Sequence, residues 1–242
     1  MIYVALPAYN EEKNIPPLLS AVSETLKGAD YKVVIVDDGS TDGTLSAARL
    51  ASGVMPVEVI PHEKNMGLGA AIKTLFAYIA KNVKSGDVVV TMDADNTHPA
   101  ALIPSMASRV AEGADIVIAS RFCAGAKTRG VPFYRNLLSR VAALIFKIAF
   151  RIRGVNDYTS GYRVISGAIL RRYFDSPEAA PLVTEAGFTA GTEILIKLSR
   201  QPGARIVEAP LDLRYDLKGG ASKMKVVSTM IKYLKLLRMA FK

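Results

Sequence analysis

Residues 88–99, VVVTMDADNTHP, join an apolar run to two carboxylates that are separated by a single residue. The high β-propensity of the run indicates a short strand buried on both faces, as in a parallel sheet. Asp93 and Asp95 follow that strand, so both carboxylates can point into a cleft and coordinate one hard cation, Mg²⁺ or Mn²⁺, together with phosphate oxygens of a substrate. Aspartate is also common in strand-to-helix turns, so the pattern needs support from its neighbours.

The first 120 residues alternate short apolar runs with longer helical patterns. Strands are predicted at residues 2–6, 32–36, 57–60, 87–91 and 115–119, and helices near residues 11–27, 42–52, 68–83 and 99–111. Strand and helix in strict alternation predict right-handed βαβ units. The expected fold class is therefore α/β, with an open, Rossmann-like, mostly parallel sheet and helices on both faces.

Polar clusters follow four of the predicted strands, at the edge where ligands bind in an open α/β sheet. They are PAYNEE from Pro7, DDGS from Asp37, DAD from Asp93, and Ser120-Arg121. Within DDGS the first aspartate often only braces the loop, and Asp38 is better placed to accept hydrogen bonds from a base or ribose. Lys64-Asn65-x-Gly67 opens the helix predicted from residue 68, where free backbone N–H groups favour an anion. No GxGxxG follows the first strand, which disfavours a dinucleotide site.

The chain length and composition suit one large domain, because half of its 242 residues are hydrophobic. The 31 Lys and Arg against 22 Asp and Glu give a net charge of +9, which favours an anionic partner such as nucleic acid, a membrane surface or a phosphorylated substrate. A single cysteine, Cys123, excludes an intramolecular disulfide and a multi-cysteine zinc site. No signal-peptide pattern and no apolar run of about 18 residues is present, so we expect a cytoplasmic protein whose contact with a membrane is peripheral.

The positive charge is concentrated in two segments, since 18 of the 31 basic residues fall within residues 121–172 and 217–242. Each segment carries an apolar stripe at helical spacing with Lys and Arg beside it. The first stripe is Val141, Leu144, Ile145, Ile148 and Ile152, and the second is Met230, Leu234, Leu237 and Phe241. Each stripe fits either a helix packed on the core or an amphipathic helix at a membrane interface.

Five motifs in this order, PAYNEE, DDGSTDGT, KNMGLGAA, MDADNTHP and ASRF, resemble those of the family 2 glycosyltransferases, and within them the dolichyl-phosphate mannose synthase group of polyprenyl-phosphate glycosyltransferases. The resemblance continues through RNLLSR, DYTSGYR and GASK, so it spans nearly the whole chain. It implies a GT-A fold in a single domain over residues 1–242. In that domain, residues 1–120 would bind a nucleotide sugar, and residues 121–242 would bind the acceptor and supply C-terminal amphipathic helices at a membrane interface.

The resemblance also implies roles for matching residues. The donor would contact Pro7, Tyr9, Glu11, Val36, Asp38, Asp93, Ala94, Asp95, Arg121, Arg214 and Lys223, and the acceptor phosphate would contact Arg121, Arg135, Ser139 and Arg140. Mg²⁺ or Mn²⁺ would bind Asp93 and Asp95. Thr97 stands where close relatives often place a metal-binding glutamine, and Leu217 stands where relatives place an arginine, so Thr97 as third ligand and Arg214 as replacement arginine both depart from the pattern.

The implied reaction is inverting transfer of a sugar, with mannose from GDP-mannose as first choice, to a polyprenyl phosphate on the cytosolic face of a membrane, with or without a separate membrane subunit. Such an acceptor needs no general base, because a phosphate monoester is mostly ionised near neutral pH. The catalytic candidates are Asp93, Asp95, Arg121, Arg135 and Asp157. Asp157 could orient Arg135 or Arg163, bind sugar hydroxyls, or form a structural ion pair.

Other functions stay open. A UDP-sugar carrying glucose or N-acetylhexosamine could serve as donor, and a soluble saccharide acceptor would need a carboxylate base such as Asp157 or Glu193. A nucleic-acid-binding protein is disfavoured, because the basic segments carry aliphatic residues and not aromatic stacking pairs. His98 is interpreted as a cap or packing residue and His62 as a surface residue.

Overall fold

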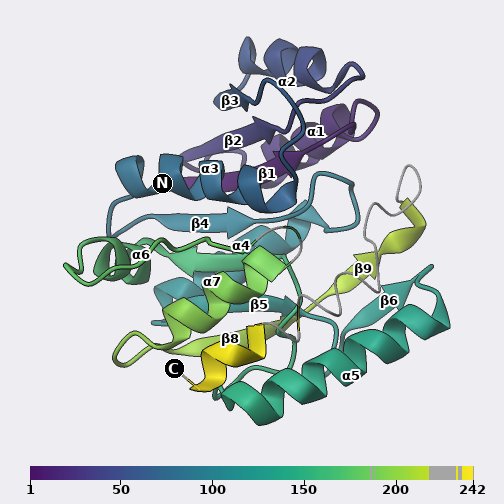
Figure 1. Cartoon of the computed structure of the whole chain (residues 1–242). Helices are drawn as coiled ribbons and strands as arrows, with labels where there is room; N and C mark the ends of the chain where they lie inside the picture. Colours follow the sequence, from purple (N-terminus) through teal and green to yellow (C-terminus); the bar gives the residue numbers. More distant parts are fainter. Residues whose placement is uncertain (186, 188, 218–232, 234–235, 242) are drawn as a thin grey trace.

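The computed structural model describes residues 1–185, 187, 189–217, 233 and 236–241, and within these the side chains of Arg135 and Phe241 are left out of the description. Its centre is a seven-stranded sheet in the order β3-β2-β1-β4-β7-β5-β8 (Figure 1). The strands are β1 (Ile2–Ala8), β2 (Tyr31–Asp37), β3 (Val57–Pro61), β4 (Val88–Thr91), β5 (Ile116–Ser120), β7 (Arg163–Ser166) and β8 (Ile206–Pro210). All five strands predicted from the sequence are present.

One strand runs against the others. β7 lies between β4 and β5 and is antiparallel to both, whereas every other neighbouring pair in this sheet is parallel. Arg163 therefore lies opposite Thr91 on one side and Ile118 on the other. This strand comes from the basic part of the chain, so that part contributes to the same sheet as the N-terminal strands.

Helices cover both faces of the sheet, because successive side chains of each buried strand point to opposite faces. Val4 and Leu6 pack with α1 (Ile15–Thr25), α2 (Thr44–Ser52) and α4 (Ile103–Ala111), which follows the short 3-10 helix η1 (Ala100–Leu102). Tyr3 and Ala5 belong to the second core, with α3 (Leu68–Asn82), α6 (Gly167–Phe174) and α7 (Thr189–Ser199). The predicted mostly parallel α/β sheet with helices on both faces is confirmed.

The helix α5 (Phe133–Phe150) lies at the edge of the molecule near a second, two-stranded sheet (Figure 1). That sheet pairs β6 (Lys127–Arg129) with β9 (Asp212–Arg214), and the 3-10 helix η2 (Tyr215–Leu217) follows β9. Phe146 of α5 is buried in the core, whereas Val141, Leu144 and Ile148 are exposed. Four of the five residues of the predicted apolar stripe therefore lie on α5, and three of them are exposed, whereas Ile152 follows the end of the helix.

Most of the second predicted stripe lies outside the described residues, including Met230, Leu234 and the side chain of Phe241. Leu237, the remaining member of the stripe, begins η3 (Leu237–Phe241), and its neighbour Leu236 is buried in the core. The expected C-terminal amphipathic helix is not confirmed. Among the helices described, none is long and apolar enough to cross a membrane.

Candidate functional site

Three loops meet at the carboxyl ends of β1, β2 and β4. The amide N–H of Asn10 donates to Ser40 Oγ at 2.9 Å, and that of Glu11 donates to Thr44 Oγ1 at 2.7 Å. Asn96 Nδ2 donates to the backbone oxygen of Asn14 at 3.0 Å, which attaches the loop after β4 to the loop after β1. Three of the four polar clusters predicted to share one edge of the sheet therefore belong to loops that lie in direct contact.

The DAD element lies at the end of β4 with its middle residue buried in the core. Asp95 is buried, and its Oδ1 accepts hydrogen bonds from the amide and hydroxyl of Thr97, at 3.2 and 2.6 Å. Asp93 is half-buried, and its amide donates to Nδ1 of His98 at 3.1 Å. The His98 ring stacks on Tyr162, so the interpretation of His98 as a packing residue agrees with its contacts.

The chemistry of this donor set fits a hard divalent cation, because carboxylate oxygens are the ligands that Mg²⁺ and Mn²⁺ prefer. Among the described residues, no group of three or more His, Cys, Asp or Glu is arranged to hold a metal. The Thr97 hydroxyl donates to Asp95 and so orients that carboxylate. Within the described part of the chain, this place thus offers a cation two carboxylates, those of Asp93 and Asp95, and the rest of its shell would come from other groups.

Asp38 braces the loop between β3 and α3. Its buried carboxylate accepts hydrogen bonds from the amides of Met66 and Gly67, at 3.0 and 2.8 Å, and contacts His62 Nδ1 at 2.7 Å. The anion expected at the start of α3 is thus supplied by the protein itself. The interpretation of His62 as a surface residue is wrong, since only 10% of its side chain is exposed.

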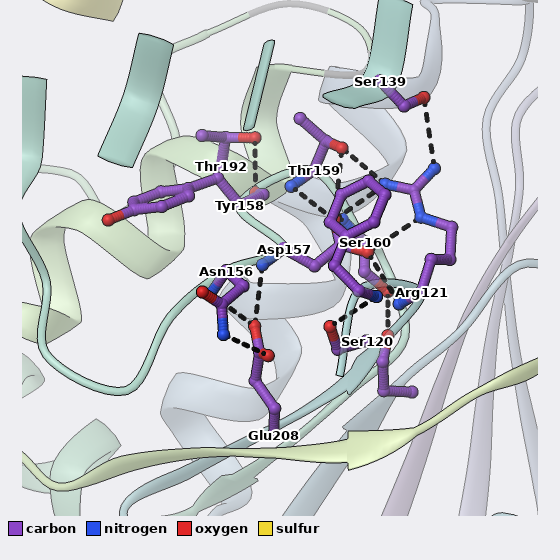
Figure 2. Close-up of polar contacts among 12 residues, drawn as sticks. Ser120, Arg121, Ser139, Asn156, Asp157, Tyr158, Thr159, Ser160, Thr192 and Glu208 are labelled. Atoms are coloured by element: carbon purple, nitrogen blue, oxygen red, sulfur yellow. Dashed lines mark hydrogen bonds and ion pairs between the residues drawn. The ribbon is translucent and has the colours of Figure 1, made fainter. Parts of the chain in front are cut away.

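Arg121 directly follows β5 and is held by the buried carboxylate of Asp157 (Figure 2). Its Nε and Nη2 donate to the two oxygens of Asp157 at 2.8 and 2.7 Å, and Nη2 also donates to Thr159 Oγ1 at 2.6 Å. Its Nη1 reaches Ser139 of α5 at 3.5 Å. This fork-shaped pair fixes the plane of the guanidinium group.

The electrostatics of the pair keep both groups charged. Burial alone would raise the pKa of Asp157, but the charge and hydrogen bonds of Arg121 outweigh it and hold that pKa below its usual range. Burial opposes the charge on Arg121 as well, yet the carboxylate of Asp157 raises the pKa of the guanidinium. Asp157 has no exposed side-chain surface, whereas 18% of the Arg121 side chain is exposed. Arg121 can therefore meet a substrate anion, and Asp157 acts as its positioning residue.

A second carboxylate, from β8, holds the loop that carries Asp157. Glu208 accepts hydrogen bonds from the amides of Asn156 and Asp157, at 2.6 and 2.7 Å, and from Asn156 Nδ2 at 3.0 Å (Figure 2). The other face of Asn156 accepts from Lys147 Nζ of α5 at 2.7 Å. Neither Glu208 nor Asn156 is predicted from the sequence as a site residue. The one signal for Glu208 is its place as the single charged residue of the run VEAP.

Glu193 and Arg163 serve to hold α7. The buried carboxylate of Glu193 accepts from the amides of Thr184 and Glu185, both at 2.8 Å, and from Lys197 Nζ at 2.5 Å. Arg163 donates to the backbone oxygens of Tyr158 and Gly191, and burial lowers its pKa to about 10. From the sequence, Asp157 is expected to orient Arg135 or Arg163, whereas among the described side chains its ion pair is with Arg121.

The DAD element and the loop 157–161 lie side by side. Thr91 Oγ1 donates to the backbone oxygen of Gly161 at 2.8 Å, and a β-carbon added to Gly161 would lie 3.7 Å from Oδ1 of Asp93. The candidate metal ligands and the candidate phosphate-binding arginine therefore border one region. The backbone of β9 joins it, because the amide of Arg214 donates to the oxygen of Thr97 at 3.1 Å.

The remaining predicted site residues have side chains that are buried, paired with other residues, exposed, or not described. The side chains of Val36 and Ala94 are buried in the two cores, so a donor would meet them only through their backbone. Arg214 directs its guanidinium to Asp216, at 2.9 to 3.2 Å. Pro7, Tyr9 and Glu11 lie at the end of β1 or in the loop after it, and Arg140 is exposed on α5. Arg135 lies in the first turn of α5 without a described side chain, and Lys223 lies outside the described residues.

Sequence comparison places the chain in a family. Residues 3–176 match the profile described as glycosyl transferase family 2, so the chain is a member of that family. A dolichol-phosphate mannosyltransferase of Pyrococcus furiosus is 36% identical over 235 residues, which cover 97% of this chain and 62% of that protein. A polyprenol monophosphomannose synthase of Mycolicibacterium smegmatis is 32% identical over 171 residues, which cover 70% of this chain and 63% of that protein. The chain thus spans less than two thirds of the length of these curated relatives.

Solved structures share the fold. Glucosyl-3-phosphoglycerate synthase from Mycobacterium tuberculosis, in complex with Mn²⁺, UDP and glucosyl-3-phosphoglycerate, superposes with a TM-score of 0.68 at 23% identity, over 100% of this chain and 78% of that one. The same enzyme with Mg²⁺ and UDP gives a TM-score of 0.66 over the same shares of the two chains. The fold expected from the sequence, GT-A, is confirmed.

Proposed function

We propose that this chain is an inverting glycosyltransferase that transfers mannose from GDP-mannose to a polyprenyl phosphate of the dolichyl type. Two curated relatives are named for this chemistry, at 36% and 32% identity. We further propose one domain over residues 1–242, with the donor bound mainly by residues 1–120 and the acceptor by residues 121–242.

The observation that carries this proposal is the state of three acids in the C-terminal half of the chain. Asp157 beside Arg121, Glu208 beneath the loop of Asp157, and Glu193 on α7 each accept several hydrogen bonds from the protein, so none is available to remove a proton from a sugar hydroxyl. A hydroxyl acceptor needs such a base, but a phosphate monoester is already ionised. The fixed guanidinium of Arg121 suits phosphate oxygens, which accept hydrogen bonds from it in a fork. The arrangement therefore favours a phosphate acceptor over a soluble saccharide.

A divalent cation, Mg²⁺ or Mn²⁺, would be held by Asp93 and Asp95. The structures of the mycobacterial synthase contain Mn²⁺ or Mg²⁺ with UDP. When bound, such an ion neutralises charge on the diphosphate of a nucleotide sugar. Thr97 orients Asp95 for this contact, and Arg121 binds phosphate charge from the side of loop 157–161. Alignment of the two substrates then accounts for much of the rate.

The proposal is tested by supplying GDP-mannose labelled in the sugar, Mg²⁺, and polyprenyl phosphate in vesicles. We expect label in the lipid fraction, with the sugar's anomeric configuration opposite to that in the donor. Lower activity with UDP-glucose and UDP-N-acetylhexosamine is the matched comparison. Transfer to a water-soluble saccharide without lipid, or transfer from the UDP-sugars alone, would overturn the acceptor or the donor, respectively.

We propose that the outer face of α5 contacts the cytosolic face of the membrane. Phe133, Tyr134, Leu137, Val141, Leu144 and Ile148 are exposed on this helix. Arg140 and Lys147 are exposed beside them, and the helix contains no acidic residue. Apolar side chains beside basic ones suit an interface with anionic lipid headgroups.

Replacing both Leu144 and Ile148 by glutamate is expected to weaken binding to phosphatidylglycerol vesicles about tenfold or more, because each side chain loses apolar burial and gains a repelled charge. Sedimentation with vesicles measures the effect. Leu50 and Val54, exposed at 77% and 88% near the other edge of the sheet, give a matched control when both are changed to glutamate. Equal vesicle binding by the two double variants would remove α5 from the membrane contact.

A further inference from the structure

His62 links β2, the loop after β2 and α3 at the carboxyl end of β3. It follows β3, and its amide donates to the backbone oxygen of Asp37 at 2.8 Å. Its ring lies between Asp38 Oδ1, 2.7 Å from Nδ1, and Thr74 Oγ1 of α3, 2.9 Å from Nε2. The imidazole is thus fixed at both nitrogens and is shielded from solvent.

The two contacts determine the direction of the hydrogen bonds. An ionised carboxylate can only accept, so Nδ1 carries the proton that is donated to Asp38. In the neutral ring Nε2 then has no proton and accepts one from the Thr74 hydroxyl. The carboxylate of Asp38 therefore sets the tautomer, and Thr74 stabilises it by donating to Nε2.

The same contact sits within a tightly packed pair of loops. A β-carbon on Gly39 would overlap the backbone of Lys64, so the loop 62–67 rests directly on the turn after β2. Asp38 also receives the amides of Met66 and Gly67. A carboxylate accepts about four hydrogen bonds. The described residues supply three here, with two of the donors on Oδ1 and one on Oδ2.

We infer that His62 is a positioning residue for the nucleoside half of the donor, acting through Asp38. By holding Oδ1 against the loop 62–67, it leaves Oδ2 in a fixed direction for a further donor. The matching ligand is a nucleobase with ring or exocyclic N–H groups, such as guanine or uracil. This inference rests on the proposed function, which assigns a nucleotide-sugar donor to this edge of the sheet.

The test compares His62→Asn, His62→Gln and His62→Phe in the full chain. The amide nitrogen of asparagine takes the place of Nδ1, that of glutamine takes the place of Nε2, and phenylalanine keeps ring volume without either nitrogen. We expect the dissociation constant of GDP, titrated calorimetrically with Mg²⁺, to rise about tenfold in His62→Phe and His62→Gln, as for loss of one charge-assisted hydrogen bond. His62→Asn should restore it to within about threefold.

The pattern separates positioning from packing, since ring volume alone would make His62→Phe the mildest variant. Thr74→Val, which removes the partner of Nε2, should raise the same constant several-fold while the KM for acceptor and kcat change by less than twofold. Ser199→Ala, a helix hydroxyl on α7 bonded to the oxygen of Ile196, serves as control.

Two failures are distinguishable in this experiment. Unchanged GDP affinity in His62→Phe and Thr74→Val, with wild-type protein that binds GDP, would overturn the inference and leave the proposed function intact. Absence of binding of GDP, UDP and their sugars by the wild-type protein would overturn the donor assignment itself. If asparagine proves as harmful as phenylalanine, the Nδ1 donor is not the property that matters, and the inference also fails.

Discussion

Replacing Asp157 by asparagine lowers the free energy of unfolding by about 3 kcal/mol or more, because it leaves the partly buried Arg121 guanidinium facing an uncharged group in a fully buried position. The side-chain amide of asparagine also brings two N–H donors to a position where six groups already donate, among them the backbone amides of Thr159 and Ser160. Urea denaturation at neutral pH measures the loss. Activity should fall as well, since Arg121 loses the partner that fixes its plane.

The control is Asp175→Asn, which breaks the ion pair with Arg171 on the surface of α6. An exposed pair of this kind contributes about 0 to 1 kcal/mol. A loss in Asp157→Asn no larger than that in Asp175→Asn would mean that the buried pair does not hold the loop.

Acid should act on the same pair. Because the folded-state pKa of Asp157 lies below the ordinary carboxyl value, its contribution is complete above pH about 4 and is lost as the pH falls through the lower, folded-state value. The difference in stability between wild type and Asp157→Asn should therefore shrink at acidic pH. A difference that stays constant down to the acid-unfolding pH would contradict this assignment.

Replacing Asp93 by asparagine is expected to lower kcat/KM for mannosyl transfer about 100-fold or more, because the amide is a far weaker ligand for a hard cation, whose stabilisation of charge is worth several kcal/mol. The change keeps the shape of the side chain, and the backbone N–H of residue 93 can still donate to His98. Transfer rates at saturating acceptor, with circular dichroism to verify folding, measure the effect.

A second readout assigns the cause. In the wild-type protein, GDP should raise the melting temperature more in the presence of Mg²⁺ than without it, since the described residues offer the cation only two carboxylates at this place. The additional rise in melting temperature that Mg²⁺ causes should vanish in Asp93→Asn and persist in Asp175→Asn. A variant that keeps both its activity and its metal-dependent shift would show that Asp93 does not bind the cation.

The order of strands and helices follows from local patterns in the chain. The run before Asp93 and the runs at residues 2–6 and 32–36 are buried strands because their side chains are apolar on both faces, and this holds whatever their neighbours are. The polar residues after each run then meet at one edge, since parallel strands end together. For this reason the sheet edge at which Asp93, Asp38 and Arg121 follow their strands could be predicted, and with it the position of the candidate site.

Other features have no local pattern. β7 is a four-residue strand within the basic part of the chain. Its place in the sheet depends on pairing with β4 and β5, which both lie more than 40 residues earlier in the chain. His62 reads as a surface residue because its partners, Asp38 and Thr74, are 24 and 12 residues away. Glu208 reaches Asp157 across 51 residues.

The sequence by itself therefore determined the fold class, the family and the edge of the sheet that carries the candidate site, because these rest on hydrophobic periodicity and on motifs within short windows. Only the tertiary structure decided which partner each buried charge has: His62 for Asp38, Arg121 for Asp157, and the loop 184–185 for Glu193. The physical reason is that a buried polar group must be satisfied by whichever donor or acceptor the fold brings within about 3 Å, and sequence spacing does not specify that neighbour.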